Sequence, residues 1–392
     1  MIDFTLTEQD QTILDVVRER ALVCRNYARY YDEHEEEFAP DELPENAQFK
    51  DKNPYALMRK SGENDTSFGV MSMLVSIGQT WGDYTVRLQQ TPGGLGNASL
   101  GAVGTDEQKA KWSSMTLAMA NTEPGCGSDS KAITTRAVLD GDEWVLNGEK
   151  IFVTTGCRCD GVIVWATLDA SAGRGAIKAF MVPKDVPGFE VTHKEKKLGI
   201  RADDTAAMVF SDCRIPRENL LGGNEEIVQK GGGGFKGLMG TFNMTRPGVA
   251  AIGLGMARAA LDFTRDELAK EGIEVDYAAS PSERSAIAQK LIEIEADLEA
   301  AELTVLHSVW LSTDGKPNNM EASIAKAKGG EVVRTATQRC LELLGGLSVS
   351  RDYLIEKWFR DVRITDIYEG TGQIQKLIIA RQILEYSAAE LS

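Results

Sequence analysis

The sequence predicts a mainly helical protein with a β-domain inserted in the middle of the chain. Helix-like spacing of apolar residues dominates the first part of the chain and returns in its last part. Between about 130 and 220 the pattern changes to alternating or β-branched runs separated by turn residues. We therefore expect an N-terminal helical domain at 1–117, a middle antiparallel β-barrel or sandwich at 118–230 and a C-terminal helical bundle at 231–392.

Two stretches interrupt the first helical region. The polar, acidic residues at 31–52 have no apolar stripe, so we expect a solvated loop or a frayed helix there. The stretch PGGLGNASLGAVG at 92–104 looks like a dinucleotide-binding fingerprint, but neither a preceding strand nor a suitably spaced acid accompanies it. We interpret its small residues as a site of close helix packing.

The middle region contains two turn dipeptides, Asp140-Gly141 and Asn147-Gly148. Both dipeptides favour the positive φ angles of tight hairpins, and both lie between alternating or β-branched runs. They predict antiparallel hairpins in a middle β-domain.

The C-terminal region follows four glycines at 231–234, which lack the Gly-Lys-Ser/Thr ending of a P-loop and are interpreted as a flexible connector. The run SPSE at 280–283 predicts a helix start, because Ser280 can cap the helix and Glu283 can complete a capping box. Apolar residues then recur every three or four positions. Further helices, which predict a bundle with surfaces for other subunits, are expected at about 318–346, 350–360 and 372–387.

Charge and composition exclude several classes of function. The 392 residues include 43 Lys and Arg against 59 Asp and Glu, a formal net charge of −16, and no basic run offsets it. Nucleic acids and anionic membranes attract clustered cations, so neither is expected as a partner. No apolar stretch is long enough to span a bilayer, and the N-terminus does not resemble a signal peptide. The sparse cysteines and scattered histidines predict reduced thiols, no metal site and a cytoplasmic protein.

Two segments carry residues suited to chemistry. ANTEPGCGSDS at 120–130 can direct backbone N–H groups and short hydroxyls at a flat polar ligand. In DIYEGTGQIQKLIIARQIL at 366–384, Glu369 is flanked by apolar residues, and a desolvated carboxyl group has a raised pKa that suits a general base. From the residues alone, a β-turn and an acid near a helix start explain these segments equally well.

Eight segments in order resemble the acyl-CoA dehydrogenase family, and together they cover nearly the whole chain. The resemblance is weakest in about the first hundred residues, and it implies the same helical, β, helical plan. The segments are GTDEQKAKW at 104–112, NTEPGCGSDS at 121–130, NGEKIFVTTG at 147–156, FSDCRIPRENLLGG at 210–223, FKGLMGTFNMTRP at 235–247, LELLGGLS at 341–348, EKWFRDVRITDIYEGTGQIQ at 356–375 and LIIARQIL at 377–384.

The resemblance implies an FAD-dependent acyl-CoA dehydrogenase that forms a trans-2-enoyl-CoA, with FAD between the β-domain and the C-terminal helices. In this family a carboxylate removes the α-proton while the β-hydrogen leaves as hydride to flavin N5. The motif matches that carboxylate to Glu369, whose backbone N–H would hold the thioester oxygen together with a flavin ribityl hydroxyl. Electrons are expected to pass to an electron-transfer flavoprotein.

The resemblance also implies the binding residues. A buried strand aromatic is the alternative interpretation of Phe152, which would otherwise cover one face of the flavin. Cofactor contacts fall on Met119, Asn121, Thr122, Gly127, Ser128, Phe152, Val153, Thr154, Glu342, Gly345, Gly346, Thr371 and Gln373. Substrate contacts fall on Ser128, Phe242, Asn243, Arg246, Tyr368 and Gly370.

Two departures from the family pattern concern the adenosine end of FAD. Many homotetrameric members carry an Arg-Lys-x-Phe-Gly run after the helix at 249–269, whereas this chain reads AKEGIEVDYAAS, with no arginine. Glu342 also replaces a glutamine near the expected pyrophosphate. Both a homotetramer and a heteromeric tetramer stay open, as do an acyl-CoA oxidase, an enoyl-CoA reductase and an FAD-retaining partner subunit. Short, branched, cyclic and steroid acyl groups all remain candidates.

Overall fold

The computed structural model describes residues 5–40, 43–49, 53–60, 65–89, 93–227 and 233–386. The chain forms two compact units, each described here by itself. The helical unit comprises Met1–Gln90, Leu198–Ala202 and Asn243–Ser392, and the β-rich unit comprises Thr91–Lys197 and Asp203–Phe242. The expected division into three domains at 1–117, 118–230 and 231–392 stays a prediction.

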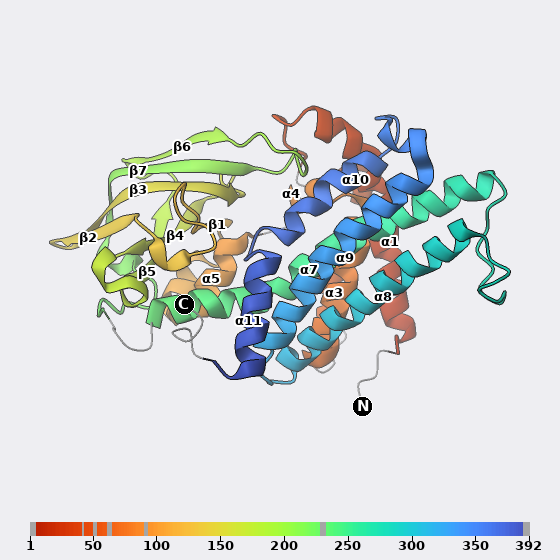
Figure 1. Ribbon diagram of the computed structural model, residues 1–392. Coiled ribbons are helices and arrows are strands. Elements are labelled where there is room, and N and C mark those ends of the chain that lie inside the picture. The colour runs from red at the N-terminus through yellow and green to blue at the C-terminus, as the bar shows by residue number, and fades with distance from the viewer. Residues whose placement is uncertain are drawn as a thin grey trace. The chain divides into compact units, whose positions relative to one another are not determined.

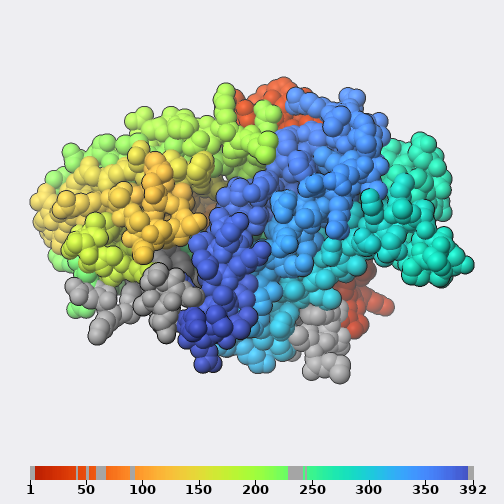
Figure 2. Space-filling view, viewed as in Figure 1, coloured from red at the N-terminus to blue at the C-terminus, as the bar shows by residue number. Residues whose placement is uncertain are grey.

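Long helices with apolar stripes build the helical unit (Figure 1). Its largest hydrophobic cluster joins side chains of α3, α7, α8, α9 and α10, because each of these helices repeats apolar residues at helical spacing. Helix α11 runs along the surface of this unit (Figure 2). The helices are α1 (Glu8–Glu33), α2 (Pro54–Lys60), α3 (Asp65–Gly82), α4 (Tyr84–Gln89), α7 (Gly233–Lys270, which begins in the other unit), α8 (Ala286–Thr313), α9 (Asn319–Leu344), α10 (Ile355–Val362) and α11 (Gly372–Leu384).

A seven-stranded sheet forms the β-rich unit, in the order β1-β4-β2-β3-β7-β6, with β5 also paired to β4. Every residue of β4 is buried, so this strand is continuously apolar or small. The pairs β1–β4 and β2–β4 are parallel, which departs from the purely antiparallel expectation. The elements are α5 (Leu95–Val103), α6 (Asp106–Trp112), β1 (Leu117–Ala120), β2 (Arg136–Asp140), β3 (Glu143–Thr154), β4 (Gly161–Thr167), β5 (Ile177–Pro183), β6 (Phe189–Lys194) and β7 (Thr205–Pro216).

One of the two predicted hairpins is present. Strands β2 and β3 pair antiparallel across Gly141, which has a φ of +64°. The second prediction is wrong, because Asn147-Gly148 lies inside β3, where the pairing with β7 shifts register. Gly148, at φ +147°, packs so closely on Thr135 that a Cβ would lie 2.6 Å from its hydroxyl oxygen. The glycine therefore serves a bulge with a close backbone approach.

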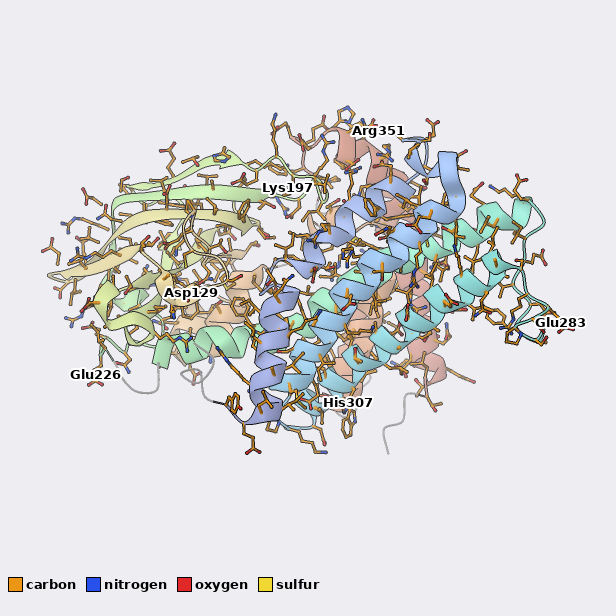
Figure 3. The ribbon with its side chains drawn as sticks, in the orientation of Figure 1. Asp129, Lys197, Glu226, Glu283, His307 and Arg351 are labelled. Atoms are coloured by element: carbon orange, nitrogen blue, oxygen red, sulfur yellow. The ribbon has the colours of Figure 1, made fainter. Side chains whose placement is uncertain are left out.

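The predicted helix start at Ser280 is also wrong. Helix α8 begins at Ala286, because Ser285 is its N-cap and accepts a hydrogen bond from the Ala288 N–H (3.1 Å). Ser280 and Glu283 do bond to each other (2.7 Å), but they close a separate turn in the loop before the helix (Figure 3). The helix expected at about 350–360 begins at Ile355 instead, whereas those expected from 318 and from 372 are confirmed as α9 and α11.

The close packing predicted at 92–104 is confirmed. A Cβ on Gly94 or Gly96 would collide with the carbonyl oxygens of Leu117 and Ala118, so glycine lets α5 approach β1. Residues 228–232, with the first two of the four predicted connector glycines, lie outside the described residues, and α7 begins at the third, Gly233. The described helices include none with the length and apolarity that a membrane crossing requires.

Candidate active site

Glu369 occupies a strained turn between a short 3-10 helix, Arg363–Asp366, and α11. The φ angle of Glu369 is +54°, in the left-handed region that residues other than glycine rarely adopt. The φ angle of Gly370 is +92°. Thr371 then caps α11, because its hydroxyl oxygen accepts from the Ile374 N–H (3.3 Å). Two successive left-handed residues followed by a capped helix fix the direction of the Glu369 side chain.

The Glu369 carboxylate has three polar neighbours, all in the helical unit. Thr245 of α7 donates its hydroxyl to Oε2, and the cations Arg246 and Lys326 act on the same carboxylate. Burial nevertheless raises the pKa of Glu369 above its ordinary value, although Thr245, Arg246 and Lys326 each lower it. The result is a carboxylate that binds a proton more readily than an exposed glutamate does.

Lys326 is a fully buried lysine of α9, and its Nζ has no hydrogen-bond partner among the described residues. Burial lowers its pKa to about 8, while Asp366 and Glu369 act in the opposite direction. Arg246 is also buried, and burial lowers its pKa while Glu369 raises it. Two partly dehydrated cations thus act on the Glu369 carboxylate.

The predicted contacts to the adenosine end of FAD lie at two places in the helical unit. Glu342 is exposed near the end of α9, where it accepts from Gln338 Nε2 (3.0 Å), so its charge is not buried. Gly345, at φ +56°, ends that helix, and Gly346 follows it. Gln373 is exposed on the first turn of α11, next to the capping Thr371.

In the β-rich unit, the two predicted flavin segments are bonded to each other. The Ile151 N–H donates to the carbonyl of Thr122 (2.9 Å), and Lys150 Nζ donates to the carbonyl of Asn121 (3.0 Å). Met119 is the last residue but one of β1, directly before this loop, and Gly127 and Ser128 are exposed further along the loop. The loop at 119–128 is therefore bonded to the residues that directly precede the segment 152–154.

Phe152 has the exposure expected of an aromatic side chain that contacts a planar ligand. Its side chain is 58% exposed at φ +57°, so the alternative of a buried strand aromatic is wrong. The neighbouring Val153 is buried, and Thr154 is partly exposed. Asn121 Oδ1 is buried and has no partner among the described residues. An exposed aromatic ring and an unpaired amide oxygen in two segments bonded to each other fit the apolar faces and polar edge of a flavin.

The predicted substrate residues differ in how far they are exposed. Phe242 is buried in the core of the β-rich unit, where it packs with Trp165 and Ile177 among others. The Asn243 side chain lies outside what the structure describes. Tyr368 and Gly370, by contrast, are partly exposed on either side of the base.

Several functional candidates escaped the sequence reasoning. Thr245 precedes the predicted Arg246, but nothing local indicates that it bonds to a residue 124 positions away. Lys326 lies in the small apolar run ASIAKAKGG, and a charge on that helix face was the available signal. Glu123 and Lys150 form a buried ion pair, with 2.7 Å between Oε1 and Nζ. They lie in the motifs at 121–130 and 147–156, where neither residue differs visibly from an ordinary polar residue.

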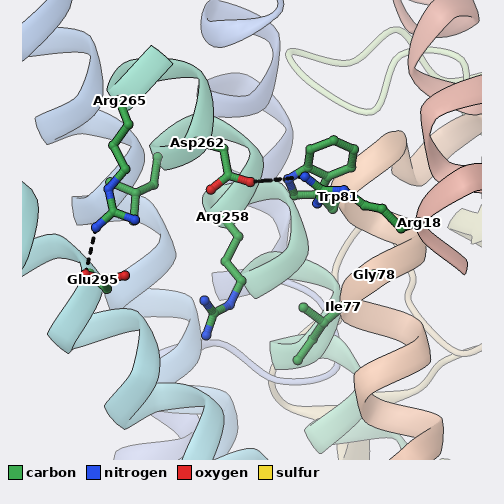
Figure 4. Close-up of a pocket in the computed structure, with 9 residues that line it drawn as sticks. Arg18, Ile77, Gly78, Trp81, Arg258, Asp262, Arg265 and Glu295 are labelled. Carbon is green, nitrogen blue, oxygen red and sulfur yellow. Dashed lines mark hydrogen bonds and ion pairs between the residues drawn. The ribbon is translucent and has the colours of Figure 1, made fainter. Parts of the chain in front are cut away.

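A separate cavity of about 220 Å³ in the helical unit is lined by none of the predicted site residues (Figure 4). Asp262 accepts from Trp81 Nε1 (2.8 Å) and pairs with Arg18 (3.6 Å). Arg265 pairs with Glu295 (2.7 Å). Because its charged groups bind one another, this cavity does not favour an additional charged ligand.

Comparison with known proteins identifies the family. The middle domain of acyl-CoA dehydrogenases matches residues 118–213, and their C-terminal domain matches residues 232–384. The mitochondrial short-chain specific acyl-CoA dehydrogenase of Bos taurus is 34% identical over 376 residues, which cover 89% of this chain and 88% of that protein.

Solved structures agree with the sequence relatives. Butyryl-CoA dehydrogenase from Megasphaera elsdenii is 30% identical with a TM-score of 0.82, covering 98% of this chain and 100% of that chain. A chain in the structure of the electron transferring flavoprotein of Acidaminococcus fermentans is 31% identical with a TM-score of 0.79, over 98% of this chain and 100% of that chain. The protein therefore belongs to the acyl-CoA dehydrogenase family, FAD-dependent oxidoreductases that act on the CH–CH bond of acyl-CoA thioesters.

Proposed function

We propose that this chain forms trans-2-enoyl-CoA from a saturated acyl-CoA, with Glu369 as the base that removes the α-proton. The observation that carries this proposal is the partly buried, Thr245-bonded carboxylate with a raised pKa on a left-handed turn. A thioester α-proton is weakly acidic, so its removal needs a base of raised pKa and a stabilised thioester oxygen. The backbone N–H of Glu369 supplies part of that stabilisation.

FAD supplies the acceptor for the β-hydrogen when it is bound. Met119, Asn121, Thr122, Gly127, Ser128 and the segment 152–154 would hold the flavin ring, and the exposed Phe152 supports this assignment. Glu342, Gly345, Gly346, Thr371 and Gln373 would hold the adenosine and pyrophosphate end. Substrate entry displaces water from Glu369, which makes the carboxylate a stronger base.

We also propose a CoA thioester with a short acyl chain, held by Ser128, Phe242, Asn243, Arg246, Tyr368 and Gly370. Similarity to short-chain specific and butyryl-CoA dehydrogenases supports the short chain. Similarity to a chain in an electron transferring flavoprotein structure supports such a flavoprotein as the electron acceptor.

The test is an anaerobic titration of the purified protein with acyl-CoAs of increasing chain length, while the absorbance of oxidised flavin is followed. We expect a short-chain thioester to bleach the flavin of the wild-type protein but not that of Glu369→Gln. This variant should still fold and bind FAD. Glu331→Gln is the matched control, because it removes one exposed carboxylate from the same unit. Bleaching that survives in Glu369→Gln would show that another group is the base.

Three alternatives give different results in the same experiment. An oxidase would reoxidise rapidly in air and release hydrogen peroxide, whereas a reductase would reoxidise its reduced flavin with an enoyl-CoA. A partner subunit that only retains FAD would bind flavin but would not bleach with any thioester.

The missing arginine in residues 269–280 favours a heteromeric tetramer, in which a companion chain completes the adenosine contacts. A chain that binds FAD stoichiometrically by itself as a homotetramer contradicts this proposal. Gel filtration with absorbance detection measures both properties at once.

A further inference from the structure

Gln375 is a fully buried amide on the first turns of α11. Its Nε2 donates to the backbone carbonyl of Glu369 (3.2 Å) and to that of Gly370 (3.1 Å). One side chain thus binds both carbonyl groups of the turn that carries the base.

This turn needs an external donor because of its conformation. Glu369 and Gly370 both have positive φ, at +54° and +92°, and a residue with a side chain adopts this region only when its surroundings enforce it. A buried carbonyl without a donor is unfavourable, so loss of the two bonds would favour relaxation of the turn.

The chemistry of an amide fixes which end faces the turn. Only the NH₂ group has two protons to donate, so the two carbonyls determine how the Gln375 amide is oriented. Gly370 permits the approach, because a Cβ there would lie 2.6 Å from Nε2. The contact requires an amide at 375 and glycine at 370 together.

Beyond the turn, the same arrangement reaches the reacting carboxylate. Gln375 holds the backbone of Glu369 from α11, and Thr245 holds its Oε2 from α7. A shift in the turn would therefore move the carboxylate relative to Thr245, even though Gln375 does not touch the carboxylate.

We propose that Gln375 is a positioning residue for catalysis, which holds the left-handed Glu369–Gly370 turn and thereby directs the Glu369 carboxylate. This inference rests on the proposed role of Glu369 as the base. Gln375→Met keeps the length of the side chain but removes both protons, whereas Gln375→Asn keeps the amide and shortens its reach by one methylene.

The readout isolates proton abstraction from oxidation. A short-chain acyl-CoA with sulfur in place of the β-carbon has exchangeable α-protons but no β-hydrogen to transfer. In D₂O, Glu369 would take an α-proton and return a deuteron, and mass spectrometry counts the deuterium in the recovered thioester. The experiment uses the FAD-loaded protein, and each rate is normalised to bound flavin.

We expect Gln375→Met to slow α-proton exchange at least tenfold and to change KM less than threefold. The acid limb of the exchange rate should move to higher pH. Gln375→Asn should fall between Gln375→Met and the wild type. The matched control is Gln108→Met, because Gln108 is a buried amide of the β-rich unit whose Nε2 also binds two carbonyls, those of Glu218 (2.9 Å) and Leu220 (2.8 Å).

The results of this exchange experiment distinguish the positioning role of Gln375 from the role of Glu369 as the base. If Gln375→Met and Gln375→Asn lower the unfolding temperature as Gln108→Met does but exchange at the wild-type rate and pH, Gln375 is structural and the inference is overturned. If Glu369→Gln still exchanges its substrate protons, the proposed function fails instead. Should Gln375→Met not fold, the rate and pH profile of Gln375→Asn decide the matter.

Discussion

Lys150 and Glu123 form a buried ion pair in the β-rich unit, with 2.7 Å between Nζ and Oε1 and exposed fractions of 0% and 3%. Glu123 also accepts hydrogen bonds from the N–H groups of Thr134 (2.7 Å) and Thr135 (2.9 Å). Lys150 lies in β3, two residues before Phe152, and Glu123 lies in the 121–130 loop. The ion pair therefore links the two segments that we propose for the flavin ring.

Lys150→Met should therefore destabilise the protein strongly. It leaves the Glu123 carboxylate buried without its cation, which costs about 3–5 kcal/mol of the free energy of unfolding. Lys111→Met is the control, because Lys111 pairs with Glu218 at the surface with exposed fractions of 55% and 68%, and such pairs contribute about 0–1 kcal/mol. Urea unfolding of the flavin-free protein measures both, and equal losses in the two variants would contradict this account.

Thr245→Val should move the pH dependence of turnover. The base is active when ionised, so a raised Glu369 pKa makes kcat fall with decreasing pH at a higher pH than an ordinary carboxyl group would. The Thr245 hydroxyl stabilises the ionised form, so its removal raises the pKa of Glu369 further and moves the acid limb of kcat to higher pH.

The control for Thr245→Val is Thr337→Val, a buried threonine whose hydroxyl bonds only to backbone carbonyls of its own helix. Its kcat profile against pH should match that of the wild type. An acid limb that moves equally in both variants would mean that the shift is a general effect of altered packing.

Several helices, one hairpin and the proposed base could be predicted from the sequence because their signals are local. Apolar spacing of three to four residues marks α9 and α11, and Asp140-Gly141 specifies a hairpin through one dipeptide. Glu369 lies in a contiguous motif. Asn147-Gly148 carries the same local signal as a hairpin, but close packing against Thr135 makes it a bulge.

The partners of the base could not be predicted, because they come from distant segments. Thr245 reaches Glu369 across 124 positions, and only the packing of α7 beside the turn brings the two together. The exposure of Phe152 likewise depends on a positive φ within β3, which overrides the alternation that would bury an aromatic residue.

Phe152→Ala should weaken FAD binding without weakening the fold. The exposed ring contributes little to the apolar core, whereas truncation of the fully buried Phe180 would cost about 3–5 kcal/mol. Loss of an aromatic face against the flavin should reduce affinity by roughly tenfold. Fluorescence titration of the flavin-free protein with FAD measures this, with the exposed Val138→Ala as control. Unchanged affinity in Phe152→Ala would remove Phe152 from the proposed flavin site.

Lys326→Met should have opposite effects on stability and activity. A buried ammonium group whose pKa is lowered to about 8 is unfavourable below that pH, because the unfolded lysine keeps its proton more readily. Methionine has a similar length and no charge, so at pH 7 we expect about 1–3 kcal/mol more stability, a gain that fades as the pH approaches the ordinary lysine pKa. Loss of the cation also raises the pKa of Glu369, so the acid limb of kcat moves to higher pH.

The exposed Lys328→Met, two positions along the same helix, is the control for removing a positive charge from α9. It should change neither the free energy of unfolding nor the kcat profile by a comparable amount. A Lys326→Met protein that loses stability and keeps the wild-type acid limb would mean that Lys326 is held by favourable contacts and does not act on the base. Gain of stability with loss of activity near neutral pH would instead mark Lys326 as a group retained for the chemistry of Glu369 at the expense of the fold.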